Sequence, residues 1–353
     1  MIMGALLVFE ALQAILYLTS DWATVSLACS YARGVTCKLM PSIIRFPTRF
    51  KFDHFLGRRI NLFGYWRNKM GQSSVIGGNL LVNRLYVDPN RGNMVVAVPV
   101  LAVYNLISSM IFSMKNFVAV PDLVKSQIVS SLRTYGNGGG PLTNGKASLQ
   151  RNGVLGDFSS TLEKDSQIKV MLIWHIATEY CNIAIFNGAE EGLHQSDAQQ
   201  VATTLSKYCA YLMYFIPDLL AENSTDTLFI VHNVVKEVQN ALGGDKPSKD
   251  RLLRVIQDSD GSGNTDNTTI AQDSATNNNE DSIFIQGLKL GMKLEAKGED
   301  LPWKVMAEFW AETIIYIAPS DKAAEHMERL AQEGEFLTHI WALLTHAGIL
   351  KRD

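Results

Sequence analysis

The C-terminal segment of this chain decides its fold. It reads G-L-K-L-G-M-K-L at 287–294, then P-W-K-V-M-A-E-F-W-A-E-T-I-I-Y-I-A at 302–318, then H-M-E-R-L-A-Q-E-G-E-F-L-T-H-I-W-A-L-L-T-H-A-G at 326–348. Apolar residues recur there at the three- and four-residue spacing of an amphipathic helix. We therefore expect helices over 283–297, 302–318 and 321–350, the last of them broken at Gly334.

These C-terminal helices carry more apolar surface than they can bury among themselves. One side of 302–318 and 336–350 gathers Met306, Phe309, Trp310, Thr313, Ile314, Ile317, Leu337, Ile340, Trp341 and Leu344. The stretch around Trp174 is apolar nearly all round, so it needs neighbours on several sides. We expect the C-terminal helices to pack against the helices of 166–220 in one core.

Capping and helix-breaking residues mark further helices upstream. The expected elements are a helix that begins at Asp122 and ends at a glycine-rich loop (136–145), an apolar helix capped by Asp165 or Ser166 that runs through Phe186, a helix capped by Ser196 and stopped by Pro217, and a helix over 227–242. The upstream sequence therefore also predicts a helical body.

The N-terminal residues favour a membrane anchor. Residues 2–18 are apolar apart from Glu10 and Gln13, and nine basic residues against one acid follow between Arg33 and Lys69. A spanning helix needs about 20 residues, and clustered Lys and Arg mark the cytoplasmic side of a span. We interpret 1–32 as an anchoring helix with its flank, at a membrane that the sequence does not identify. The alternatives are a buried helix of a soluble protein and a signal peptide.

The predicted fold class is mainly α, with an N-terminal membrane-anchoring helix followed by a cytosolic, bundle-like helical body and a disordered internal linker. The linker is inferred from a stretch of mostly Asp, Ser, Gly, Asn and Thr, which buries too little apolar area to offset the entropy of ordering. The expected divisions are the anchor (1–32), a basic juxtamembrane segment (33–93), the helical body (94–257), the disordered linker (258–282) and the C-terminal helical module (283–353).

A second uncharged stretch, 94–114, is long enough to span a bilayer, but Pro99, Asn105 and two serines dilute it. We expect it to be a buried element of the body, and a second span is the alternative.

The segment 283–353 resembles the module called domain of unknown function 594, which a large plant family carries at its C-terminus. W-H-I-A-T-E-Y-C (174–181), L-S-K-Y-C-A-Y-L-M-Y-F-I-P-D-L-L (205–220) and L-T-S-D-W-A-T-V (18–25) resemble the polytopic membrane region, domain of unknown function 4220, that usually precedes it. The resemblance implies that the anchor corresponds to the last of several spans, in a shortened paralogue or truncated gene model. It implies no known reaction.

Two groups of polar residues are candidate sites. His175, Thr178, Glu179 and Asn182 form one stripe on an otherwise apolar helix, where His175 and Glu179 could relay protons or bind a metal. The simpler interpretation is an interior hydrogen-bond network. Glu335, His339 and His346 share a face of the last helix and are the candidate metal ligands. Their positions on the helical wheel favour the outer, solvated face of an ordinary amphipathic helix instead.

The sequence G-P-L-T-N-G-K-A (140–147) differs from a phosphate-binding loop in its last position, where Ala147 replaces the hydroxyl that would bind magnesium. Because glycines and a proline surround it, we interpret it as a surface loop.

The charge pattern bears on partners. The net charge is −3, and the chain after Lys69 is acidic, which argues against nucleic acid. The basic run 33–69 interleaves aromatic residues and suits a lipid surface; the alternatives for this run are a plain solvated juxtamembrane face and nucleic acid. We predict a non-enzymatic interaction or scaffold protein at a cytosolic membrane face, with an unidentified protein partner and no cofactor. The alternative is an enzyme or metal-binding protein that uses His175 and Glu179.

Overall fold

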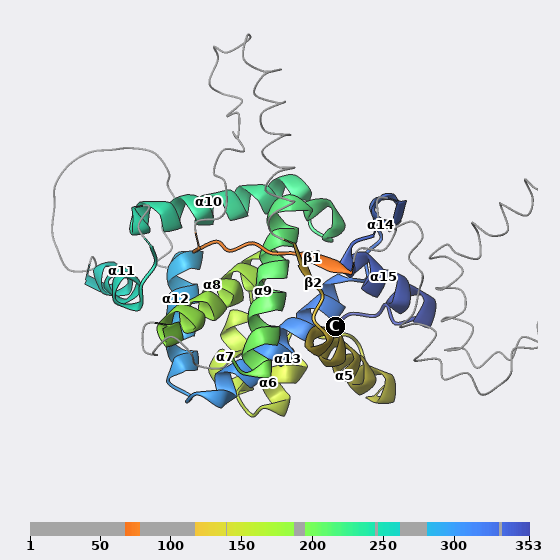
Figure 1. Ribbon diagram of the computed structural model, residues 1–353, viewed down its shortest axis with the longest axis horizontal. Coiled ribbons are helices and arrows are strands. Elements are labelled where there is room, and N and C mark those ends of the chain that lie inside the picture. Colours follow the sequence, from red (N-terminus) through yellow and green to blue (C-terminus); the bar gives the residue numbers. More distant parts are fainter. Residues whose placement is uncertain are drawn as a thin grey trace, which may run out of the picture. The chain divides into compact units, whose positions relative to one another are not determined.

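The computed structural model describes residues 68–77, 117–138, 140–186, 195–243, 246–261, 281–331 and 334–353. The described chain is mainly α-helical, as predicted (Figure 1). It divides into two compact units, each described below by itself. The larger comprises residues 69–322 with 351–353, and the described part of the other is essentially 323–350.

The larger unit contains a two-stranded antiparallel ribbon and a set of packed helices. Its elements are β1 (Lys69–Gly71), β2 (Phe117–Ala119), α5 (Asp122–Gly138), α6 (Lys146–Arg151), α7 (Leu155–Phe158), the 3-10 turn η1 (Ser159–Thr161), α8 (Gln167–Phe186), α9 (Asp197–Phe215), the 3-10 turn η2 (Pro217–Leu219), α10 (Ser224–Leu242), α11 (Lys249–Gly261), α12 (Ile283–Glu295) and α13 (Asp300–Ile317). The other unit contains α14 (Ala323–Ala331) and α15 (Phe336–Ala347).

Helix α8 is the centre of the larger unit. Its residues from Val170 to Cys181 are all buried, because α9 packs on one side and α12 on another. The Trp174 indole stacks on the Phe309 ring of α13, with the ring centroids 3.8 Å apart. Next to it, Trp310 Nε1 donates a hydrogen bond of 3.0 Å to Thr178 Oγ1. A helix that is apolar all round is thus enclosed on all sides, as its sequence predicts.

Helices α12 and α13 pack where the sequence places them. Helix α12 lies against α8, and α13 lies against α9, α5 and α6. The expected packing of the C-terminal helices on 166–220 is therefore confirmed for α12 and α13. The expected helices over 283–297 and 302–318 are also confirmed, and the last expected helix is divided near Gly334 into α14 and α15.

The contact between α12 and α8 depends on two glycines one helical turn apart. A Cβ atom on Gly287 would lie 2.6 Å from the Ile176 side chain and 3.0 Å from the Ile173 carbonyl oxygen. A Cβ atom on Gly291 would lie 2.7 Å from the Tyr180 ring. Real Cβ atoms do not approach neighbours that closely, so only glycine permits the observed distance between the two helices.

Side chains cap the starts of α8, α9 and α10. Two of these caps come from the residue just before the helix, and the third comes from a distant residue. The Ser196 side chain accepts a hydrogen bond from the Gln199 N–H at the start of α9. Asn223 caps α10 in the same way. At the start of α8, Glu222 accepts hydrogen bonds from the backbone N–H groups of Gln167 and Ile168, at 2.6 and 3.3 Å. The positive end of the helix dipole also stabilises a carboxylate at this position.

Residues 69–77 belong to the helical body, which corrects the expected basic segment 33–93. Met70 is fully buried, and Val75 and Ile76 are 5% and 2% exposed. The Ser73 N–H donates to the Lys207 carbonyl oxygen of α9 at 3.0 Å. The physical reason is local: M-G-Q-S-S-V-I-G carries no charge, so it can be buried where the preceding basic residues could not.

Two features of the helix boundaries differ from the sequence prediction. Helix α5 continues to Gly138, because Tyr135 in its last turns is held by a 3.1 Å hydrogen bond to Thr143. Helix α11 was not predicted, and it continues through Gly261 into the expected linker 258–282. Its apolar residues Leu252 and Ile256 anchor it in the core.

Several of the remaining predictions concern residues that the structure does not describe. The anchor 1–32, the basic residues 33–67, the stretch 94–114 and the linker residues 262–280 all lie outside the described residues. Among the described residues, no helix combines the length and apolar character that crossing a bilayer requires.

Replacing Gly287 by alanine tests the glycine contact. Alanine raises helix propensity by about 1 kcal/mol, yet the new methyl group must push α12 away from α8. We expect the free energy of unfolding to fall by about 1–3 kcal/mol, measured by urea denaturation. The control is Gly156→Ala in α7, because no heavy atom lies within 4 Å of its added Cβ. Equal effects at both positions would contradict the close approach.

Candidate functional site

His175 lies in the interior of the larger unit and joins three segments. Its Nε2 atom accepts a hydrogen bond of 3.1 Å from the Val75 backbone N–H. Its Nδ1 atom lies 2.8 Å from the Ser206 hydroxyl of α9. Because Nε2 is an acceptor, the neutral ring carries its proton on Nδ1 and donates it to Ser206. The imidazole thus connects α8 to α9 and to residues 72–77.

His175 is neutral at physiological pH. The side chain is fully buried. Burial lowers its pKa to about 4, against the opposing effect of the Glu179 charge, while the positive charge of Lys207 lowers it further. Loss of solvation disfavours the charged imidazolium, and this cause is the largest. The group that the sequence nominated as a proton relay therefore does not titrate near neutral pH.

Glu179 is engaged with different partners. The Ser74 hydroxyl donates to Oε2 at 2.5 Å, and Lys207 Nζ lies 3.8 Å from Oε1. The Lys207 ammonium thus provides the nearest positive charge for a carboxylate that is 5% exposed. Glu179 also joins α8 to the 72–77 segment.

The other two residues of the stripe face neighbouring helices. Asn182 Oδ1 accepts from Gln199 of α9 at 3.3 Å, and Thr178 accepts from Trp310 of α13. The stripe that the sequence identified is therefore real, and its members bond α9, α13 and residues 72–77 around α8. Its geometry is that of an interior network.

The geometry of His175 does not suit nucleophilic catalysis. A base that activates a serine must present an unprotonated nitrogen to the hydroxyl. Here the nitrogen that faces Ser206 carries the proton, and the basic nitrogen is occupied by the Val75 N–H. Both His175 and Ser206 are fully buried, so a substrate would have to open the core to reach them.

The segment 140–147, expected to be a surface loop, contributes Leu142 and Gly145 to the interior, while Gly140 and Lys146 are exposed. Leu142 is fully buried, and a Cβ atom on Gly145 would lie 2.3 Å from the Phe309 ring. Gly145 adopts a φ of 78°, which favours glycine as well. The local sequence indicates a turn but not that the turn is covered by α13, which is why its burial was missed.

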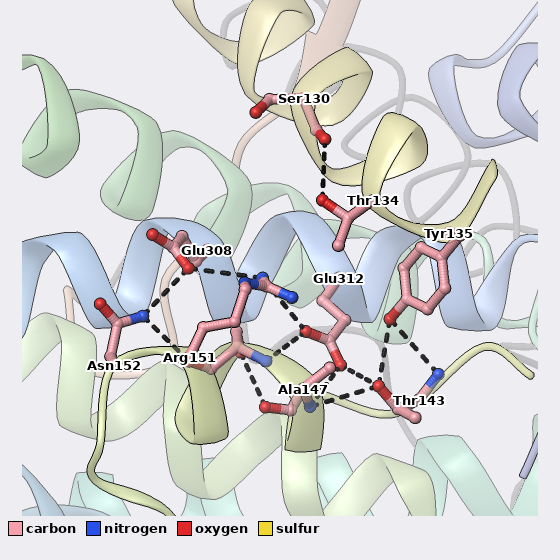
Figure 2. Close-up of polar contacts among 11 residues, drawn as sticks. Ser130, Thr134, Tyr135, Thr143, Ala147, Arg151, Asn152, Glu308 and Glu312 are labelled. Atoms are coloured by element: carbon pink, nitrogen blue, oxygen red, sulfur yellow. Dashed lines mark hydrogen bonds and ion pairs between the residues drawn. The ribbon is translucent and has the colours of Figure 1, made fainter. Parts of the chain in front are cut away.

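A buried carboxylate occupies the place where a phosphate would bind in such a loop. Figure 2 shows Glu312 of α13 directed at the start of α6, where the Ala147 and Ser148 N–H groups donate to it at 3.0 and 2.7 Å. The Thr143 hydroxyl also donates to Glu312. Glu312 is 1% exposed, so these donors compensate its charge. The amide groups are thus already engaged by the protein itself.

Charged and phenolic groups complete this cluster. Arg151 Nη2 lies 3.7 Å from Glu312 and 3.4 Å from Glu308, which also accepts from Asn152 at 3.0 Å (Figure 2). Burial and then the Glu312 charge raise the pKa of Tyr135 to about 12. The phenol therefore stays protonated. The cluster fixes α5, α6 and α13 together, and sequence spacing could not reveal it because its members are far apart in the chain.

The second group of candidate residues lies on α15. Glu335 is 7% exposed and accepts from the Phe336 N–H at the start of the helix. His346 Nδ1 lies 2.7 Å from the Ala342 carbonyl oxygen, and the His339 ring lies against Gly334. Glu335 is thus buried at the start of the helix, whereas His339 and His346 are partly exposed.

The sequence analysis missed His326, which is fully buried in the unit of α14 and α15. Its ring stacks on Trp341 with centroids 4.6 Å apart, and its Nδ1 lies 3.0 Å from the hydroxyl of Thr338, which is also fully buried. Within the part of the chain that the structure describes, no three His, Cys, Asp or Glu side chains are grouped to hold a metal ion.

An open groove lies on the surface between α10, the start of α8 and the start of α12. Its volume is about 570 Å³, and its walls are formed by Asp165, Ser166, Lys169, Glu222, Asp226, Phe229, Ile230, Asn233, Val234, Glu237 and Ile283. Helix α10 crosses the ends of α9 and α12 at this place (Figure 1). Phe229 is 54% exposed there. The residues of α10 that line the groove recur at helical spacing in the sequence, so they could be assigned to one face of the helix. Only the tertiary structure shows that this face borders a groove.

Comparison with known proteins places one part of the chain. Residues 295–349 match the sequence model of a family described as protein of unknown function, DUF594. The matched range covers α13, α14 and α15. Neither the curated proteins nor the solved structures gave a match. The resemblance of the C-terminal module is thus supported, and the match carries no statement of activity.

Acid should destabilise the protein through His175. Between its folded pKa of about 4 and its ordinary value of 6.5, the unfolded chain binds the proton more readily. The free energy of unfolding should therefore fall as the pH drops from about 7 to about 4, by roughly 3 kcal/mol in total. Urea denaturation across this range should show a steeper pH dependence for the wild type than for His175→Gln.

The comparison with His175→Gln isolates this one residue. His326, whose pKa burial also lowers to about 4, titrates in both proteins and cancels. Parallel pH dependences for the wild type and the variant would show that His175 is not held neutral by burial.

Glu312→Ala should destabilise the larger unit strongly. The Thr143 hydroxyl and the Ala147 and Ser148 N–H groups would lose their acceptor inside the core. We expect the free energy of unfolding to fall by about 3 kcal/mol or more, and by less in Glu312→Gln, which keeps one acceptor oxygen. Lys304→Ala, at an exposed position of the same helix, is the control. Loss below about 1 kcal/mol in Glu312→Ala would show that the carboxylate is not the acceptor these groups depend on.

Proposed function

We propose that this chain is a non-enzymatic, membrane-anchored interaction protein whose helical body presents a docking surface on the cytosolic side of a membrane. We place it in the plant membrane-protein family that combines domain of unknown function 4220 with the C-terminal module. The match over 295–349 supports the module, and the resemblance of 174–181 and 205–220 supports the region before it.

One contrast carries the proposal. The side chains capable of acid–base chemistry that were considered above are His175, Glu179 and Glu312. All three are buried and hydrogen-bonded inside the body. The open groove lies elsewhere, at α10, and it exposes an aromatic side chain. An enzyme that used these three side chains would need them in an accessible pocket, whereas an interaction protein needs an accessible apolar surface. The arrangement favours the second.

The sequence at the N-terminus supports the membrane part of the proposal. Residues 2–18 are apolar apart from Glu10 and Gln13, and the nine basic residues between Arg33 and Lys69 follow them. Basic residues of this kind suit the anionic lipid headgroups of a cytosolic membrane face. The surface of the described body has the opposite character around the groove, where acidic residues predominate. The two parts therefore suit different partners, lipid for the first and protein for the second.

A photo-crosslinker tests both parts in the full-length chain. With benzoylphenylalanine at position 229, the protein in isolated membranes should resist carbonate extraction and give a discrete crosslinked product on illumination. The same group at Met292, which is exposed on α12 away from the groove residues, should give little of this product. Phe229 is mostly exposed, so the substitution should leave the fold intact.

Several outcomes would contradict the proposal. Release of the chain into the soluble fraction would contradict the membrane anchor. Glycans on Asn223, which begins the acceptor sequence N-S-T, would contradict the cytosolic orientation. Equal crosslinking from positions 229 and 292, or none from either, would remove the docking surface. Protease protection of closed vesicles reports the orientation independently.

A further inference from the structure

We propose that the groove at α10 binds a basic segment of another protein, a short helix that inserts an apolar side chain against Phe229 and places a Lys or Arg beside Asp226. This inference rests on the proposed function and specifies the chemistry of the partner. It is argued from the apolar floor of the groove, from the distribution of its charges and from its length.

The floor of the groove is an apolar stripe on α10. Phe229, Ile230 and Val234 follow one another at helical spacing, and Ile283 of α12 closes the stripe. The large exposed apolar side chains of the described residues are Val118, Val129, Phe229, Met292, Met327, Leu343 and Leu350, and Phe229 has the highest exposed fraction, 54%. An aromatic ring at the edge of a groove is the type of residue that dominates binding energy at interfaces.

The walls of the groove are acidic. They carry four carboxylates, from Asp165, Glu222, Asp226 and Glu237, against the single cation Lys169. Such a surface repels anionic lipid headgroups and nucleic acid and attracts a cationic partner. The lipid surface proposed for the basic segment is therefore not a candidate occupant here.

The carboxylates are not equally available. Asp165 pairs with Lys169 at 2.9 Å. Glu222 is bound to the backbone N–H groups at the start of α8, and Glu237 accepts a hydrogen bond from Ser282. Asp226 is exposed to solvent in the first turn of α10, three residues before Phe229. The position for a partner cation is therefore beside Asp226, one helical turn from the apolar anchor.

The length of the stripe sets the size of the partner. The lining residues of α10 run from Asp226 to Glu237 on one face of the helix. At 1.5 Å per residue this face is about 16 Å long, which corresponds to about three turns of a bound helix. An amphipathic helix that lays its apolar side in a groove is a common mode of peptide recognition. The groove thus fits a helical segment of about 11 residues.

Synthetic peptides test the chemistry with the purified full-length chain in detergent. The probe is a fluorescein-labelled 12-residue helical peptide with leucine on one face and lysine on the other. One comparison peptide replaces the leucines by serine, and another replaces the lysines by glutamate. In fluorescence anisotropy we expect binding of the lysine–leucine peptide alone, with an affinity that decreases as salt is added.

Groove variants locate the binding. Phe229→Ala and Asp226→Asn should each reduce the affinity for the lysine–leucine peptide by about fivefold or more, which is the effect expected of a dominant interface residue. Met292→Ala and Glu299→Gln remove an exposed apolar and an exposed acidic side chain outside the groove, and should change the affinity by less than about twofold. Circular dichroism should be the same for all four variants.

Three results would overturn this inference. The first is equal binding of the lysine–serine peptide, which would show unspecific attraction to an acidic surface. The second is unchanged affinity in both groove variants. The third is binding of phosphatidylserine vesicles by the body that Phe229→Ala abolishes. If one of these results is obtained while position 229 still gives a specific crosslinked product in membranes, only the basic partner is rejected. The proposed docking surface is then retained.

Discussion

The close approach of α12 to α8 is the constraint on which the larger unit depends. Gly287 and Gly291 remove the side chains that would hold the two helices apart, and Ile176 and Tyr180 fill the space. Helix α13 follows α12 after a short turn and therefore lies against α9 and α5. This position brings Trp310 to Thr178 and Glu312 to the start of α6. Both the aromatic core and the polar cluster follow from where α12 lies.

The two polar clusters have the same physical origin. Residues 72–77 and 143–148 are irregular or begin a short helix, so the N–H groups of Val75, Ala147 and Ser148 do not form the regular backbone hydrogen bonds of a helix or strand. Core helices supply the missing acceptors: His175 receives the Val75 N–H, and Glu312 receives those of Ala147 and Ser148. An unpaired N–H in the interior costs about 1–3 kcal/mol, so these buried polar side chains stabilise the fold. Groups that resemble catalytic residues in sequence are thus required for structure.

Much of the fold could be predicted from local patterns, and the clusters could not. Helical spacing, the cap at Ser196 and the stop at Pro217 are properties of adjacent residues, and they agree with the structure. The polar stripe at His175 was also visible. Its partners in 74–75 lie about a hundred residues away, and Glu312 lies 164 residues from Ser148, so spacing held no signal for either. The burial of Leu142 and Gly145 was missed because glycine and proline indicate a turn, not its exposure.

Helix α10 shows why a functional surface can be separated from the requirements of folding. Its inner face buries Thr227, Val231, Val235 and Val238, and these residues suffice to hold the helix on the body. Phe229 points to a different side, where burial in the fold does not account for it. Single exposed apolar residues are common in proteins, but this one borders a groove with an apolar floor and acidic walls. Neither the core nor solubility requires an aromatic ring there, and the proposed docking surface therefore depends on this side chain.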